Sequence, residues 1–135
     1  MSGAVVAGAI AVSVLGAVPA NAEGKRSTYI SYWSTGQESS RWQDNNTDAS
    51  ITAVKFSNCT APSSPGKRAS ALISLRKDVV GPDPHRGQSG DVCTGIGKRW
   101  GDESAGKYYF TLDRINGTQG PGNFHLDANP VEIWY

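Results

Sequence analysis

Cysteine and histidine are scarce in this sequence of 135 residues, which has two of each. Cys59 and Cys93 are far apart, and no histidine lies at ligand spacing from them, so the pattern does not indicate zinc. The G-x-S-x-G turn of many serine hydrolases and the glycine-rich phosphate loop are both missing. The sequence therefore contains no motif that indicates a particular reaction.

A strong net charge is also missing. Thirteen lysines and arginines balance twelve aspartates and glutamates, which leaves a formal net charge of +1. The basic residues are scattered among acids, whereas a nucleic-acid-binding protein usually concentrates positive charge on one face. We therefore expect no nucleic-acid partner.

The one long apolar run, from Ala4 to Val18, is too short to cross a membrane. Spanning a bilayer takes about 20 apolar residues, and this run falls about five short of that length. Pro19 and then Ala20-Asn21-Ala22 follow, which matches the small-x-small rule of signal peptidase. The pattern predicts a signal peptide over residues 1–22 and a single mature domain over residues 23–135, with no membrane span in the mature chain.

This N-terminal segment lacks one usual feature of a signal peptide. A basic region normally precedes the apolar run, yet the first cation in the chain is Lys25. We therefore expect the natural start to lie upstream of Met1, or the N-terminus to have been shortened. The apolar run and the cleavage site still predict a secreted, extracellular protein.

Export changes how the two cysteines are interpreted. An even number of cysteines in an exported protein indicates disulfide bonding, and two cysteines allow only one pairing. A Cys59–Cys93 bond would close a loop of about 35 residues and stabilise the fold by about 3–4 kcal/mol in the chain-entropy description.

Helical patterns are scarce as well, and short strand-like segments take their place. In residues 107–113, Tyr108, Phe110 and Leu112 alternate with polar neighbours, which is typical of a half-buried antiparallel strand. Gly, Pro, Asn and Asp separate these segments. Five to eight short strands predict an all-β fold, a single small antiparallel β-sandwich or barrel with one disulfide. The expected strands are Thr28–Trp33, Ser50–Phe56, Ser70–Arg76, Lys107–Asp113, Phe124–Leu126 and Val131–Tyr135.

Tryptophans beside small and polar residues are the candidate binding residues. Trp42 precedes Asp44, Trp100 precedes Asp102, and Trp134 alternates away from its apolar neighbours. Extracellular β-sandwiches often stack sugar rings on exposed aromatic faces, with nearby acids that hold the hydroxyls. The alternative is that these tryptophans pack in the core, because a small β-domain needs large side chains.

An acidic segment resembles a calcium-binding loop. Asp44, Asn46 and Asp48 place oxygen ligands at alternate positions, as a calcium loop would. The segment departs from the EF-hand pattern, since Ala49 stands in place of the glycine and Lys55 in place of the bidentate glutamate. The alternative is an Asx-rich turn that leads into the following strand, with no cofactor.

These observations favour a secreted β-domain that binds an extracellular partner, which would be a glycan, a cell-wall component or a protein. A small secreted hydrolase such as a ribonuclease is one alternative, and it would use His85 or His125 with a carboxylate. A protease inhibitor is another, with Arg86 displayed in the loop Gly81–Gly90. The absence of catalytic motifs makes an enzyme the less favoured class.

The chain contains several short motifs that include aromatic or basic residues. They are Arg41-Trp42, Lys55-Phe56 before Cys59, Leu75-Arg76 with Asp78, and Gly106-Lys107-Tyr108-Tyr109-Phe110 with Ile115-Asn116-Gly117. These motifs resemble those of small secreted actinobacterial proteins of the Streptomyces type. The resemblance implies an extracellular bacterial setting and no particular activity, so it transfers no functional residue to this chain.

Overall fold

The computed structural model describes residues 24–47, 51–62, 66–118 and 124–135. Over these residues the chain forms strands joined by loops and turns, and it contains no helix that could cross a membrane. The predicted signal peptide and Asp48 lie outside the described residues. The strands are β1 (Lys25–Trp33), β2 (Trp42–Asp44), β3 (Thr52–Phe56), β4 (Ala71–Asp78), β5 (His85–Gln88), β6 (Lys98–Gly101), β7 (Gly106–Ile115) and β8 (Leu126–Trp134).

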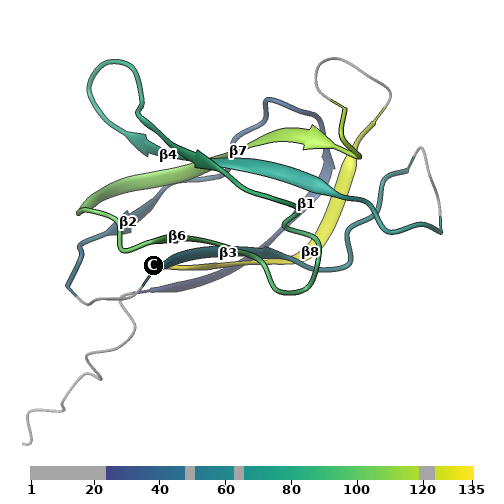
Figure 1. The fold of residues 1–135 in the computed structure, drawn as a ribbon, viewed down its shortest axis with the longest axis horizontal. Coiled ribbons are helices and arrows are strands. Elements are labelled where there is room, and N and C mark those ends of the chain that lie inside the picture. Colours follow the sequence, from purple (N-terminus) through teal and green to yellow (C-terminus); the bar gives the residue numbers. More distant parts are fainter. Residues whose placement is uncertain (1–23, 48–50, 63–65, 119–123) are drawn as a thin grey trace, which may run out of the picture.

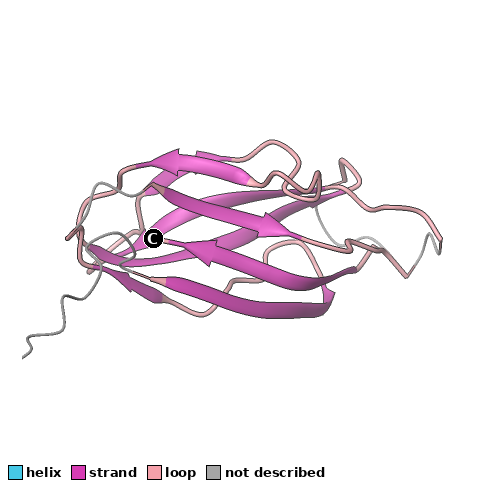
Figure 2. Ribbon diagram, turned by 90° about the horizontal axis from the view of Figure 1, so that it is seen from below, coloured by secondary structure: helices cyan, strands magenta, loops and turns pink. Residues whose placement is uncertain are grey.

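The strands form two four-stranded sheets with antiparallel pairing throughout. Sheet A has the order β1-β8-β3-β6, and sheet B has the order β2-β7-β4-β5. Figure 1 shows the two layers, with β4 and β7 in one and β3 and β8 in the other, and Figure 2 shows them from below. This arrangement confirms the predicted all-β fold and identifies it as a sandwich of two separate sheets.

The core lies between the sheets and follows the alternation seen in the sequence. Val54 and Phe56 of β3 are fully buried, as are Phe110 and Leu112 of β7. The Phe56 and Phe110 rings lie 5.5 Å apart and join the two layers. The alternate residues of both strands point away from the core, because side chains along a strand face opposite sides of the sheet.

The predicted disulfide is present between Cys59, just after β3, and Cys93, before β6. Both cysteines belong to the buried core, and the bond spans 34 positions of sequence. The neighbouring Val92 connects the sheets through its backbone, since its carbonyl accepts from Phe56 and its N–H donates to Ala71. The disulfide therefore lies where the chain passes from one sheet to the other.

Three strands of the structure were not predicted from the sequence. They are β2, β5 and β6, each of three or four residues, and each lies at an edge of its sheet. So few residues give too little alternation to reveal a strand. β1 is also longer than predicted, since it begins at Lys25 and not at Thr28.

Candidate functional site

The outer face of sheet B carries a group of polar side chains. Alternation along β7 turns Tyr109, Thr111 and Asp113 away from the core. On the neighbouring strand β4, Ser74 lies opposite Thr111 and Arg76 lies opposite Tyr109. These five side chains therefore share one surface, and their order on it is set by the register of the two strands.

Two loops raise walls around this surface. The segment after β1 runs along β7, where Gly36 N donates to the Leu112 carbonyl at 2.7 Å and Leu112 N donates to the Gln37 carbonyl at 2.9 Å. On the other side, the β4–β5 loop contributes Pro82 and Asp83. These two loops therefore flank part of the outer face of sheet B on opposite sides.

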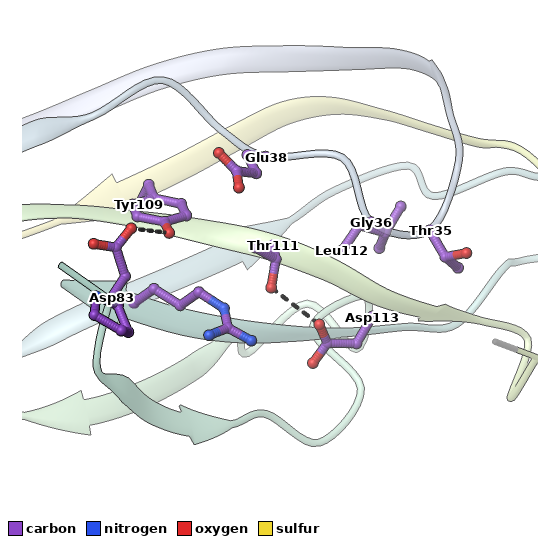
Figure 3. A pocket seen from close by; sticks show the side chains of 10 residues that line it. Thr35, Gly36, Glu38, Asp83, Tyr109, Thr111, Leu112 and Asp113 are labelled. Atoms are coloured by element: carbon purple, nitrogen blue, oxygen red, sulfur yellow. Dashed lines mark hydrogen bonds between the residues drawn. The ribbon is translucent and has the colours of Figure 1, made fainter. Parts of the chain in front are cut away.

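The result is an open cavity of about 640 Å³, which we call the sheet-B cavity. Its lining combines charged and neutral hydrogen-bonding groups with apolar surface from Pro82, Leu112 and the Tyr109 ring. Figure 3 shows these side chains around the strand β7. The polar side chains that line it include Glu38, Arg76, Asp83, Tyr109, Thr111 and Asp113.

Tyr109 and Asp83 form a close hydrogen-bonded pair at one wall (Figure 3). The Tyr109 hydroxyl donates to Asp83 Oδ2 at 2.5 Å, and the Val79 N–H donates to Oδ1 at 3.0 Å. Because both donors favour the charged carboxylate, they lower the pKa of Asp83, the tyrosine having the larger effect. Burial, together with the bond to Asp83, raises the pKa of Tyr109 to about 12.

Arg41 covers Tyr109 from the side of β2. Its guanidinium carbon lies 3.8 Å from the centre of the Tyr109 ring, a cation–π distance. The same guanidinium contacts Glu38 at 3.0 Å and Asp78 at 3.4 Å. Burial alone would lower the pKa of Arg41, but the two carboxylates raise it. Arg41 is therefore a charged, fully engaged side chain at the rim.

Asp113 lies at the centre of a second network. Its Oδ1 accepts from the Thr111 hydroxyl at 3.0 Å, and its Oδ2 accepts from Gln88 Nε2 at 2.8 Å and from the Ser74 hydroxyl. The Ser74 oxygen also lies 2.9 Å from His85 Nε2. In a hydrolytic triad the histidine would lie between the serine and the acid, whereas here the serine lies between the other two. Ser74 is also only 2% exposed, so it is not placed as a nucleophile.

The candidate tryptophans Trp42 and Trp100 lie in different sheets. Trp42 of β2 is buried, with its ring centre 6.5 Å from Tyr108 and 6.0 Å from Tyr135. Trp100 of β6 is half-buried, and its indole N–H donates to the Gly87 carbonyl at 3.0 Å. Trp42 therefore packs in the core, as in the alternative given above, and its ring is not exposed for a sugar to stack on.

Trp134 lies on the outer face of sheet A. It is half-buried, and Lys25 Nζ lies 5.2 Å from its ring centre. Lys25 and Trp134 are register partners on β1 and β8. The structure therefore distributes the three candidate tryptophans over two sheets and does not gather them into one aromatic face.

The acidic candidates are also separated. Asp44 is buried at the end of β2, and its Oδ1 accepts from the Asn46 N–H at 2.8 Å, which is the Asx-type contact of a turn. Asp102 is exposed just after β6. No group of three His, Cys, Asp or Glu side chains within the described ranges is placed to hold a metal. The calcium hypothesis stays a prediction, because Asp48 lies outside those ranges.

The basic and imidazole candidates are held by neighbours. Arg86 lies in β5 and contacts the buried Glu103 through two nitrogens, each at 2.9 Å. His125 stacks on Tyr32, with ring centres 3.6 Å apart and planes 7° from parallel. Tyr32 is 61% exposed and has a φ of 55°, which sequence patterns did not reveal. This stacked pair belongs to the side of β1 and not to the sheet-B cavity.

No protein-family model matches the chain, and neither a curated protein nor a solved structure matches it. The fold and the site define the protein as an antiparallel, disulfide-linked β-sandwich with a polar cavity on the outer face of one sheet.

Proposed function

We propose that this protein is a secreted binding module whose sheet-B cavity holds part of an extracellular glycan. The signal-like N-terminus and the single disulfide support an extracellular setting. A glycan is the proposed partner because its hydroxyl groups both donate and accept hydrogen bonds. A site for such a ligand needs donors and acceptors close together on a rigid surface.

The observation that carries this proposal is the composition of the cavity. Glu38, Asp83 and Asp113 offer carboxylate oxygens, while the Arg76 guanidinium offers donors. Strands hold Arg76, Thr111 and Asp113, and a site built on strands keeps its geometry better than one built on loops alone. A volume of about 640 Å³ falls within the range of small-molecule sites, roughly 300–1,000 Å³.

Binding measurements test the proposal directly. The disulfide-bonded protein is titrated calorimetrically with soluble polysaccharides of neutral, basic and acidic sugars. Asp83→Asn and Asp113→Asn should each weaken the binding of any glycan that binds the unmodified protein by about tenfold, the effect of losing one good hydrogen bond to a charged group. Glu132→Gln is the matched control, because Glu132 faces outward from sheet A beside Lys25 and Lys55.

Two results would reject the proposal. One is that no glycan in the panel binds. The other is that a glycan binds but the two cavity variants bind it as well as the unmodified protein does, since its site would then lie elsewhere. If Glu132→Gln alone weakens binding, the glycan uses the outer face of sheet A.

A secreted hydrolase is the second candidate, and what supports it is the chain of contacts from His85 through Ser74 to Asp113 beside the cavity. It requires His85 to exchange a proton with a bound substrate. Incubation with RNA and with a panel of glycans, followed by analysis of the products, tests it. Cleavage that disappears in His85→Ala would support the hydrolase, and intact substrates would reject it.

A further inference from the structure

One cation of the sheet-B cavity differs from the other arginines that lie among acids. Arg41, Arg68 and Arg86 each form a salt bridge of 3.4 Å or less with a carboxylate. Arg76 is half-buried, and it has neither a salt bridge nor a side-chain hydrogen bond to any residue that the structure describes. It affects Asp83 only through space, as the weakest of the influences on that carboxyl group.

The acids around Arg76 are already engaged with other donors. Glu38 contacts Arg41 at 3.0 Å. Asp83 accepts from Tyr109, and Asp113 accepts from three side chains. Each carboxylate of the cavity therefore has a partner within the protein. The Arg76 guanidinium donates no hydrogen bond to any residue that the structure describes. A partly buried charge gains most from a partner that supplies both charge and hydrogen bonds.

We propose that the glycan bound in the sheet-B cavity carries a carboxylate on its sugar ring, and that this carboxylate binds the Arg76 guanidinium. This inference rests on the proposed glycan-binding function. Arg76 is positioned for the contact by β4, whose alternation turns its side chain toward the outer face of sheet B between Tyr109 of β7 and His85 of β5. Because β4 is paired with β5 on one side and β7 on the other, the backbone of Arg76 is held in place.

The charge of the cavity favours a carboxylate over a phosphate monoester. A planar guanidinium forms two parallel hydrogen bonds with the two oxygens of a carboxylate. The three lining carboxylates outnumber the one lining guanidinium and leave two negative charges. A doubly charged phosphate would meet more repulsion from them than a singly charged carboxylate does. The ligand chemistry is thus a sugar acid, either a uronic acid of a polysaccharide or a lactyl ether on a cell-wall amino sugar.

A pair of ligands that differ only in charge tests this inference. Polygalacturonate is compared by calorimetry with its methyl ester, in which the same chain has its carboxylates masked. The free acid should bind at least about tenfold more tightly than the ester, as expected for one charge-assisted contact. Cell-wall fragments that carry the lactyl ether, with and without an amidated carboxyl group, form the second arm and distinguish the two sources.

Substitutions at Arg76 assign the effect to this residue. Arg76→Gln should remove the preference for the free acid, and Arg76→Lys should keep part of it, because lysine retains the charge and loses the planar fork. Arg99→Gln is the matched control, since Arg99 is an exposed arginine of β6 in the other sheet. Circular dichroism checks that each variant is folded. If Arg76→Gln does not fold, Arg76→Lys and the ester comparison still decide the question.

The outcomes separate this inference from the function on which it rests. Equal binding of acid and ester in both arms would overturn the role of Arg76, while a glycan that still needs Asp83 and Asp113 would keep the proposed function. Tighter binding of a sulfated glycan than of any sugar acid would also overturn the inference. Failure of every glycan to bind would reject the function itself. Preference for the acid in either arm, lost in Arg76→Gln, supports the inference.

Discussion

The Tyr109 hydroxyl donates a 2.5 Å hydrogen bond to Asp83 Oδ2 and thereby ties the centre of β7 to the loop between β4 and β5. The two residues are 26 positions apart in sequence. Asp83 in turn accepts from the Val79 N–H, which closes its own loop. The Tyr109 side chain on β7 therefore holds the β4–β5 loop in place beside the sheet-B cavity.

Replacing Tyr109 by phenylalanine removes this tie. The hydroxyl is the largest influence that lowers the pKa of Asp83, so Tyr109→Phe should raise that pKa toward its ordinary value of 3.8. A lowered pKa in the folded state contributes stability above pH 3.8, and that contribution is lost as the pH falls through the folded-state pKa. The variant should thus unfold at lower urea concentration at neutral pH, with a smaller difference in acid.

The control for this experiment is Tyr29→Phe. Tyr29 is 66% exposed, so loss of its hydroxyl should leave the urea midpoint nearly unchanged. Nuclear magnetic resonance titration of the Asp83 carboxyl carbon gives an independent measurement of its pKa. An Asp83 pKa that is the same in the unmodified protein and in Tyr109→Phe would show that the hydroxyl does not govern the carboxylate.

The Tyr109 phenol should ionise late. Its pKa is raised to about 12, because burial and the neighbouring Asp83 charge both disfavour a phenolate. A raised pKa means that this contribution to stability is complete below pH 10 and is lost as the pH rises through about 12. Ultraviolet titration of the five tyrosines should show a late step that is missing in Tyr109→Phe. Persistence of that step in the variant would assign it to another tyrosine.

The sequence predicted the parts of the fold that depend on alternation. In β7 the apolar positions Tyr108, Phe110 and Leu112 are fully buried, as their period of two indicated. The pairing of strands could not be predicted in this way. β7 lies between β2 and β4, which are distant in sequence from it and from each other, so the order within the sheet depends on long-range contacts.

None of the candidate binding residues taken from the sequence lines the sheet-B cavity, and only the shared face of three lining residues was predicted. Alternation placed Tyr109, Thr111 and Asp113 together on the polar face of one strand, and the structure keeps them there. Glu38 and Asp83 reach the same cavity from loops, and loop positions depend on backbone hydrogen bonds that no short sequence pattern encodes. A large aromatic side chain suits both a sugar-binding face and a small core, so the sequence alone does not distinguish the two roles for a residue such as Trp42.

The disulfide should contribute substantially to stability. The double variant Cys59→Ala with Cys93→Ala frees a loop that spans 34 positions and should lower the free energy of unfolding by about 3–4 kcal/mol. Urea denaturation followed by tryptophan fluorescence measures the change. Reduction of the unmodified protein should destabilise it to a similar extent, which separates the loss of the bond from the loss of sulfur packing. Equal urea midpoints for all three samples would contradict the prediction.

Gly95 and Gly97 give a matched test of the packing between the loop before β6 and strand β3. Both have left-handed backbones, with φ of 86° and 80°. A side chain at Gly95 would meet no atom within 4 Å, whereas a Cβ at Gly97 would lie 2.7 Å from the Val54 carbonyl oxygen and 2.9 Å from the Lys55 Cβ. The two positions therefore share the same backbone strain and differ in the space that is available.

Gly95→Ala should lower the free energy of unfolding by about 1–2 kcal/mol, the cost of a left-handed backbone for an L-residue. Gly97→Ala should lower it by roughly 1–3 kcal/mol more than that, because the loop must also move away from β3. That movement would disturb the pairing of Val54 with Lys98, which joins β6 to sheet A. Urea denaturation of the two variants measures the difference, and equal destabilisation would show that β3 and this loop do not approach as closely as the structure has them.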